Sequence, residues 1–323
     1  MRFISTRGDA PDVGFVDALL DGLAPDGGLY TPEVWPTLTA DEIAGFAGAP
    51  YARVAADILE RFAGDEIAAT HLQGLCQDAY AGFADPAVAP LRQLAPGRFL
   101  LELFHGPTLA FKDLAIQMLA RLYEHVMATH GRPVTIVCAT SGDTGGAAVA
   151  AFGGRANVRV VALYPEGRIS EVQRRFMTTA GNDNVRCVAV AGDFDDCQAI
   201  LKALFDDRAF ADAVGLTAVN SINVARIVAQ CVYYFTAAVA LGAPGRPVVF
   251  AVPTGNFGDA FAGWAARQMG LPIERLVVAT NGNDIVARAL ETGIYRRSAA
   301  VATQSPVAFI LSPLLTGGKT FKA

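Results

Sequence analysis

The chain has 323 residues, is 52% hydrophobic and has a formal net charge of -5 at pH 7. This is enough apolar sequence for a substantial core and for about two domains. The acidic balance, and the lack of a basic cluster interleaved with aromatic residues, argue against a nucleic-acid-binding surface. The longest apolar run, residues 231–243, is too short to span a bilayer and is expected to form a buried helix.

The cysteines and histidines show neither disulfide nor metal-binding spacing. Five cysteines are scattered without a CxxC pair, and the four histidines lack HExxH spacing. A disulfide framework and a metal site are therefore not expected, and the cysteine pattern is typical of a reducing cytosol. The first residues, MRFISTRGDAPD, contain no apolar signal segment, so the sequence predicts a cytoplasmic protein.

Residues 1–82 are predicted to form a helical N-terminal unit. A first helix is expected to stop at the Pro-Asp-Gly-Gly of residues 25–28. Thr39 is a suitable N-cap for the next helix. Apolar residues at helical spacing in 51–63, followed by Gly64, predict a third.

From about residue 99 the pattern changes to short, continuously apolar strands that alternate with helices. The strand-like runs are 98–104, 133–140, 158–165, 185–192, 247–255 and 275–280, and each precedes a helical segment. Repeated strand–loop–helix units with such strands indicate an α/β fold with parallel sheet covered on both faces. Ligands of such sheets bind at the carboxyl ends of the strands.

Two strand-to-helix loops are rich in glycine and polar capping residues. They are ATSGDTGGAA, residues 139–148, and VPTGNFGDAF, residues 252–261. Glycine permits positive φ and close backbone approach, and free N–H groups at the start of a helix attract anions. The alternative is that both are ordinary capped turns. Neither loop contains GxGxxG, which disfavours hydride transfer, and Pro313 breaks the P-loop pattern that residues 313–321 resemble.

Lys112 lies at the expected start of a helix, in the stretch FHGPTLAFKDLAIQML of residues 104–119. Lysine is scarce here: of 26 basic residues, the lysines are Lys112, Lys202, Lys319 and Lys322. A desolvated lysine can lose its proton and attack a carbonyl, whereas a guanidinium stays protonated. Burial and the helix dipole both favour the neutral amine. The alternative is a surface lysine paired with Asp113; Lys202, on an amphipathic helix, is expected to be solvated.

A reactive amine and an anion-binding loop on a parallel-sheet scaffold suit pyridoxal phosphate (PLP). Five segments, HGPTLAFKD, TSGDTG, NSINVARI, VPTGNFGD and ATNGND, closely resemble the threonine synthase family, as do the starting MRFISTRG and APDGGLYTP. The resemblance runs in order over residues 1–306. It implies a fold type II (tryptophan-synthase-β-like) architecture of two parallel-sheet α/β domains with a helical N-terminal unit, and a PLP-binding catalytic region over residues 83–306.

The resemblance also implies roles for individual residues. Lys112 would bind the PLP aldehyde as a Schiff base and act as the base at the substrate's α-carbon. The backbone amides of Gly255, Asn256, Phe257 and Gly258 would bind the PLP phosphate. The substrate carboxylate would rest on Ser141, Gly142, Asp143 and Thr144. The substrate phosphate would be received by Arg168, Ser170, Asn220, Ser221, Asn223 and Arg226. The alternative is that Asn223 and Arg226 only cap and pair on their helix.

The implied reaction converts O-phospho-L-homoserine and water to L-threonine and phosphate, the last step of threonine biosynthesis. A cytoplasmic monomer or homodimer that acts on a small molecule, without nucleic acid, membrane or metal, is expected. Another fold type II enzyme, such as a serine or threonine dehydratase, is an alternative, although NSINVARI and the N-terminal unit favour threonine synthase.

The resemblance stops after VATQSP, residues 301–306, where family members continue with a stretch that includes a hydroxyl facing the pyridine nitrogen. Residues 307–323 contain Lys319 and Lys322, and no acidic residue follows Glu291. We therefore expect a divergent tail, as after a frameshift or in a truncated gene. A second hypothesis follows: an inactive remnant that only binds PLP or other anions.

Overall fold

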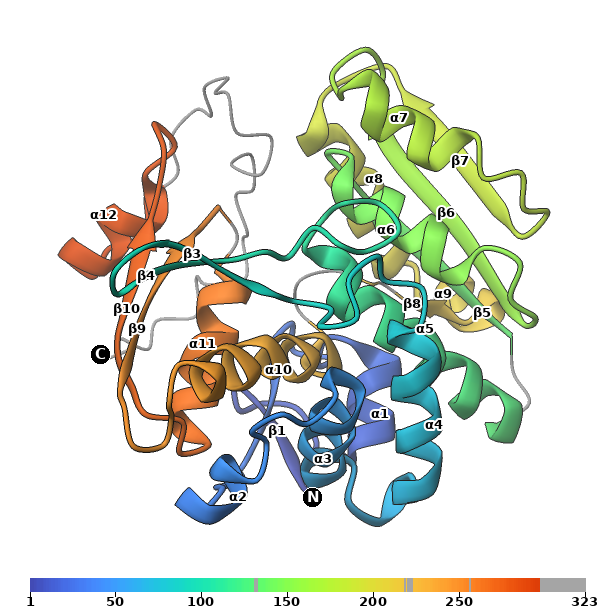
Figure 1. Ribbon diagram of the computed structural model, residues 1–323. Coiled ribbons are helices and arrows are strands. Elements are labelled where there is room, and N and C mark those ends of the chain that lie inside the picture. Colours follow the sequence, from blue (N-terminus) through green and yellow to red (C-terminus); the bar gives the residue numbers. More distant parts are fainter. Residues whose placement is uncertain (131–132, 218, 220–222, 256, 297–323) are drawn as a thin grey trace.

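The computed structural model describes residues 1–130, 133–217, 219, 223–255 and 257–296 (Figure 1). The N-terminal unit contains the helices α1 (Phe15–Asp21), α2 (Ala40–Ala44), α3 (Tyr51–Ala63) and α4 (Ala69–Tyr80), with a 3-10 turn, η1 (Gly64–Glu66). The three predicted helices are present, but the first ends at Asp21, where Gly22 has a φ of +70°, and not at residues 25–28. The Thr39 side chain caps α2 in a reciprocal capping box with Glu42. The unit also contains a short antiparallel pair, β1 (Phe3–Ser5) and β2 (Tyr30–Pro32), which the prediction of a helical unit omitted.

A parallel sheet of strand order β7-β6-β5-β8 forms one half of the α/β region. Its strands are β5 (Val134–Ala139), β6 (Val158–Pro165), β7 (Val185–Val190) and β8 (Leu216–Thr217), connected by α6 (Asp143–Phe152), α7 (Glu171–Thr178), α8 (Phe194–Asp206) and α9 (Arg208–Val214). Helix α8 packs on one face of β5 and β6, where Cys197 and Leu201 join a small separate core. Helix α6 packs on β5 and β6 as part of the main core. The predicted parallel sheet with helices on both faces is confirmed here.

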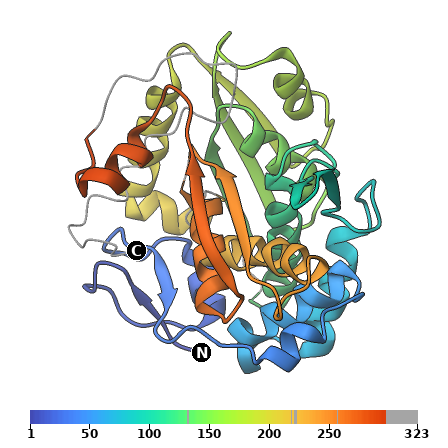
Figure 2. The ribbon, with the colours of Figure 1, turned by 60° about the vertical axis from the view of Figure 1, so that its left-hand side comes forward.

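A second parallel pair consists of β9 (Val248–Pro253) and β10 (Ile273–Ala279). Each strand leads into a helix, α11 (Gly258–Gln268) or α12 (Ile285–Thr292). Figure 2 shows this pair, in orange and red, side by side and apart from the green and yellow strands of the larger sheet. It is covered less completely than the larger sheet, since Val249 and Val277 are exposed.

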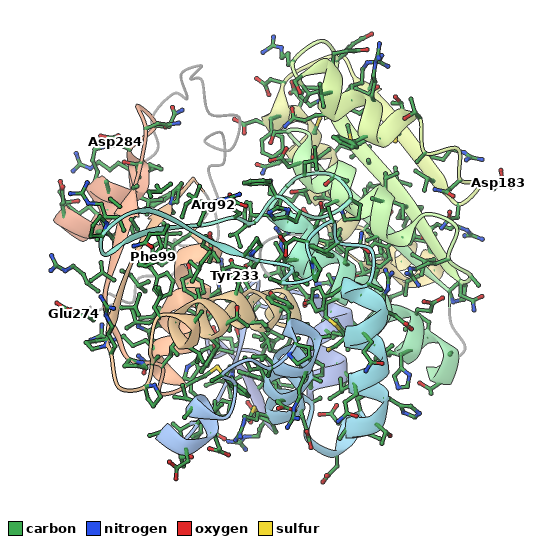
Figure 3. The ribbon with its side chains drawn as sticks, viewed as in Figure 1. Arg92, Phe99, Asp183, Tyr233, Glu274 and Asp284 are labelled. Carbon is green, nitrogen blue, oxygen red and sulfur yellow. The ribbon has the colours of Figure 1, made fainter. Side chains whose placement is uncertain are left out.

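The run 98–104 does not form a strand of a parallel sheet, which corrects the prediction. Its first residues form β4 (Arg98–Leu101), which pairs antiparallel with β3 (Leu91–Ala95). Only residues 96 and 97 connect the two strands, and Gly97 has a φ of +71°. A connection this short brings the chain straight back on itself, so the strands form a hairpin. Arg92 and Phe99 lie on this hairpin (Figure 3).

Two long helices, α5 (Lys112–His130) and α10 (Val224–Ala240), join the N-terminal unit to the α/β region. Helix α10 packs against α3, α5 and α11 and is buried along most of its length, as predicted for the run 231–243. The main hydrophobic core is therefore continuous from the N-terminal unit to both parallel sheets. Tyr123 and Asn223 strengthen this junction by donating hydrogen bonds to the Leu19 carbonyl, both at 2.8 Å. Within the described residues, no helix is both long and apolar enough to cross a membrane.

Candidate active site

Lys112 is the first residue of α5 and its side chain is only 3% exposed. The turn before it is held by Asp113, whose carboxylate accepts hydrogen bonds from the Thr108 backbone amide (2.7 Å) and hydroxyl (2.8 Å). Gly106 is needed because a Cβ there would lie 2.4 Å from the Asp113 Cβ. The expected helix start is confirmed, and the alternative of a surface lysine paired with Asp113 is wrong. Lys202, by contrast, is 74% exposed, as predicted, and it pairs with Asp206.

The amine of Lys112 lies 3.6 Å from the Oδ2 atom of Asp143. Burial lowers the pKa of Lys112 to about 8, Arg226 adds to this lowering, and Asp143 opposes it. The lowering of the Lys112 pKa by desolvation is therefore larger than the raising by its single carboxylate partner, Asp143. Near neutral pH a small fraction of the amine is free of its proton, which is the state that can attack a carbonyl or accept a proton.

The loop between β5 and α6 presents free backbone amides to the same region. The Thr140 hydroxyl accepts hydrogen bonds from the amides of Gly142 and Gly145, both at 2.9 Å. The amides of Asp143 and Thr144 donate to no residue that the structure describes. Because they stand at the start of α6, where the helix dipole favours negative charge, they can hold an anion such as a carboxylate.

The glycines of this loop also make room for α7. A Cβ on Gly142 would lie 2.4 Å from the Gln173 Cδ, and one on Gly145 would lie 2.4 Å from the Met177 sulfur. The close approach of α7 is therefore a second reason why glycine is required at these two positions, and the sequence did not suggest it. Gln173 was also missed, although Ser170 and Gln173 match the spacing of a capping box and do form one at the start of α7.

A cavity of about 410 Å³ opens beside these groups. It is lined by Thr108, Leu109, Ala110, Phe111, Gly142, Asp143, Gly146, Ser170, Val172, Gln173 and Phe176. Three predicted substrate-binding residues, Gly142, Asp143 and Ser170, are therefore brought together around one space. Lys112 does not line the cavity itself, and the Asp143 carboxylate reaches from the cavity wall to its amine.

Arg226 is a buried cation on α10, 1% exposed. Its Nη1 donates to the Val219 carbonyl at 3.2 Å, and its Nε has no partner among the described residues. Burial lowers the pKa of Arg226 to about 10, so the side chain is still charged at neutral pH. A buried guanidinium with an unpartnered N–H is costly unless an anion binds it.

Asn223 uses both ends of its side-chain amide inside the fold. Its Oδ1 accepts from the Ala225 amide at 3.0 Å, which caps α10, and its Nδ2 donates to the Leu19 carbonyl. For Asn223, the structure therefore agrees with the alternative that this residue caps its helix. Arg168 is exposed, and its backbone amide donates to the Pro165 carbonyl. Asn220, Ser221 and Asn256 lie outside the described residues, as does the predicted tail over residues 307–323.

The second glycine-rich loop connects β9 to α11. The amides of Gly255, Phe257 and Gly258 donate to no described residue. Asp259, in the first turn of α11, is half-buried, and desolvation raises the pKa of its carboxyl group. Its Oδ1 accepts hydrogen bonds from the hydroxyls of Tyr233 (2.5 Å) and Tyr234 (2.9 Å) on α10. Figure 3 shows Tyr233 near the centre of the molecule. The loop is thus anchored to the helix that carries Arg226.

All five cysteines are free. Among the described residues, no group of three or more His, Cys, Asp or Glu side chains is arranged to hold a metal ion.

Comparisons with known proteins match most of the chain. Residues 2–80 match the family described as "Threonine synthase N terminus", and residues 89–310 match "Pyridoxal-phosphate dependent enzyme". Threonine synthase from Pseudomonas aeruginosa is 52% identical over 306 residues, which cover 95% of this chain and 65% of that protein.

Two crystal structures of threonine synthases are also similar. The PLP-bound enzyme from Brucella melitensis is 55% identical, with a TM-score of 0.91, over 95% of this chain and 66% of that one. The Escherichia coli enzyme is 40% identical, with a TM-score of 0.88, over 98% of this chain and 72% of that one. The chain thus spans about two thirds of the length of these relatives. The expected fold type II architecture is confirmed, and the chain belongs to the threonine synthase family of pyridoxal-phosphate-dependent enzymes.

Proposed function

We propose that this chain uses PLP to convert O-phospho-L-homoserine and water to L-threonine and phosphate. The observation that carries the proposal is the buried amine of Lys112, whose pKa is lowered to about 8 and which stands beside a cavity. Family membership supports the same reaction. When bound, PLP would supply an electron sink for the charge released at the substrate's α-carbon.

The residues present fit such a cofactor. A buried primary amine suits an aldehyde, and Lys112 would hold the cofactor through Nζ. The amides of Gly255, Asn256, Phe257 and Gly258 would hold its phosphate at the start of α11. The Oδ1 atom of Asp259 would not compete with the phosphate for those amides, because it already accepts hydrogen bonds from the Tyr233 and Tyr234 hydroxyls.

The substrate carboxylate would rest on the start of α6, at Ser141, Gly142, Asp143 and Thr144. Asp143 contributes through its backbone amide, since its own carboxylate repels another anion. Lys112, as a neutral amine, would take the proton from the substrate's α-carbon. Its lowered pKa makes this state accessible near neutral pH.

The substrate phosphate would be received by Arg226, whose buried guanidinium needs an anion. Ser170, which lines the cavity, would assist. Arg168, Asn220, Ser221 and Asn223 complete the proposed set, with Asn223 acting through its cap of α10. A cofactor and a substrate that both carry phosphate account for anion-binding groups on α6, α10 and α11.

The organisation expected from the sequence belongs to the same proposal. We divide the chain into an N-terminal unit of residues 1–82, a catalytic region of residues 83–306 and a divergent tail of residues 307–323. The first two lie close to the matched family segments, 2–80 and 89–310, although the second match extends four residues into the proposed tail. We place the enzyme in the cytoplasm, as a monomer or homodimer that acts on a small molecule and binds neither nucleic acid nor membrane. The free cysteines support a reducing compartment.

The test combines a trapping experiment with an assay. Borohydride reduction after PLP addition, followed by peptide mapping, is expected to find the pyridoxyl group on Lys112 and nowhere else. Incubation with O-phospho-L-homoserine is expected to release threonine and phosphate in equal amounts.

An adduct at another residue, or none, contradicts the proposal. Deamination of serine or threonine without phosphohomoserine activity would identify a dehydratase. An adduct at Lys112 without any turnover would identify an inactive chain that only binds the cofactor.

A further inference from the structure

Four side chains form a continuous line from the start of α7 to the start of α5. The Gln173 Oε1 accepts from the Ser170 hydroxyl (2.9 Å) and backbone amide (3.2 Å). The Gln173 Nε2 donates to the Asp143 Oδ1 at 2.7 Å, and the Asp143 Oδ2 lies 3.6 Å from the Lys112 amine. The line thus links residues on three different helices, all at their N-terminal ends.

The direction of this line is fixed by donor and acceptor chemistry. An amide has one acceptor end and one donor end. Because Ser170 offers two donors, the Gln173 oxygen faces Ser170, and its NH₂ group therefore faces the Asp143 carboxylate. The missing Cβ of Gly142 provides the space in which the Gln173 side chain lies. One Asp143 oxygen is thereby held by Gln173, and the other remains for Lys112.

We propose that Asp143 is the counter-ion that keeps the proton on Lys112 in the cofactor-free chain, and that Gln173 is a positioning residue that holds Asp143 there. The relevance of this to catalysis rests on the proposed role of Lys112. The contact between α7 and α6 then helps to set the pH at which Lys112 becomes a nucleophile.

The charged groups that act on Lys112 come from two helices that pack on α5. Asp143 of α6 favours the charged amine, and Arg226 of α10 disfavours it. Asp113, on α5 itself, is turned to Thr108. Burial is the largest influence and lowers the pKa of Lys112 to about 8 even with Asp143 in place. Loss of Asp143 leaves burial and Arg226 unopposed, so the amine would release its proton at lower pH.

The scarcity of lysine makes a direct measurement feasible. The chain has only four lysines, so nuclear magnetic resonance of lysine labelled with ¹³C at Cε gives few signals, and Lys112→Arg assigns the one from Lys112. Its chemical shift follows protonation of the amine. The cofactor-free chain is expected to titrate near pH 8.

Three variants test the two roles. Asp143→Asn is expected to lower the Lys112 midpoint by about one pH unit or more, since an opposite charge at this distance shifts a pKa by about 1–3 units. Gln173→Met, which keeps the length of the side chain, is expected to lower it less, because the Asp143 carboxylate loses the donor that orients it. Thr178→Ala removes a hydrogen bond on the same helix, from the Thr178 hydroxyl to the Arg174 carbonyl, and is expected to leave the midpoint unchanged.

The double variant separates positioning from general damage to the fold. In the Asp143→Asn background, Gln173→Met is expected to cause no further shift, because Gln173 acts through the carboxylate that is now absent. A further shift of equal size would show that Gln173 acts independently and would overturn its role. An unchanged midpoint in Asp143→Asn would overturn the counter-ion. Circular dichroism of each variant checks that it is folded.

The outcome of this titration does not depend on whether the proposed function is correct. The titration is made on cofactor-free protein and needs no turnover. If PLP does not attach to Lys112, the proposed function is wrong while the counter-ion result stands. If PLP attaches but the midpoints do not move, the function stands and the counter-ion is wrong.

Discussion

The two glycine-rich loops have similar sequences but use their acidic residue in opposite ways. TSGDTG and GNFGD both place an aspartate in the first turn of a helix that follows a parallel strand. Asp143 of the first loop lines a cavity and faces the Lys112 amine. Asp259 of the second is half-buried and accepts hydrogen bonds from two tyrosine hydroxyls of α10. An acid at the start of a helix is favoured in both places by the dipole, and the neighbouring helix decides what else it does.

The largest effect is expected from removing the Lys112 amine, which the Asp143 carboxylate of the first loop faces. Lys112→Met is expected to abolish PLP attachment and yet to raise the free energy of unfolding at pH 7 by about 2–3 kcal/mol. The folded pKa of Lys112, about 8, is below its ordinary value of 10.5, so the folded chain binds fewer protons between these values. The cost of the buried ammonium is fully present below pH 8.

Urea unfolding of the wild type and of Lys112→Met at pH 7 and pH 10 measures this effect. The difference in the free energy of unfolding between wild type and Lys112→Met is expected to shrink towards pH 10. The reason is that the wild type gains stability as its unfolded state loses the extra proton. A difference that stays constant with pH would show that burial does not lower the pKa of Lys112.

Asparagine substitution of the aspartate in each loop is expected to change the free energy of unfolding in opposite directions. Asp143→Asn removes the partner of a buried ammonium and is expected to lower the free energy of unfolding by about 1–3 kcal/mol at pH 7. Asp259→Asn keeps an acceptor for the two hydroxyls and removes a buried charge, so it is expected to raise stability at pH 7. Burial raises the pKa of Asp259, so its folded state binds more protons, and the advantage of asparagine is expected to fade as the pH is lowered. Equal signs for the two variants, measured by urea unfolding, would contradict the contrast between the loops.

An effect of similar size is expected where the first loop meets α7. Gly142→Ala is expected to cost about 1–3 kcal/mol, because its Cβ would lie 2.4 Å from the Gln173 Cδ and its φ is +130°. Gly167→Ala is the matched control: its φ is also positive, at +66°, but a Cβ there would meet nothing within 4 Å. Thermal unfolding of both variants measures the difference. A cost at Gly142 no larger than at Gly167 would mean that α7 does not depend on this close approach.

Much of the local structure could be predicted from the sequence. Helical spacing and capping residues placed α1, α2 and α3 of the N-terminal unit, whereas α4 was not predicted as a separate helix. Apolar runs found the strands of both parallel sheets except the two-residue strand β8. The run 98–104 was predicted wrongly, because a strand paired antiparallel in a hairpin is as apolar, over so few residues, as one in a parallel sheet.

The site was predicted in part. Scarcity of lysine and its place at the start of a helix pointed to Lys112, which the structure shows to be buried. The partners of Lys112 were not predicted: Asp113, next to it in sequence, is turned away, and Asp143 is used instead. Gln173, Tyr233 and Tyr234 were missed because each acts on a residue at least 25 positions away.

The sequence by itself determined most of the helices and parallel strands, where several of them begin, and which lysine is unusual. These features depend on interactions between residues a few positions apart, such as a cap, a glycine turn or a repeating apolar face. Only the tertiary structure decided which carboxylate faces Lys112, which aspartate accepts from the tyrosines of α10 and why the glycines of the first loop are needed. Those outcomes depend on the packing of α6, α7, α10 and α11 against one another, and spacing along the chain does not specify which side chains meet there.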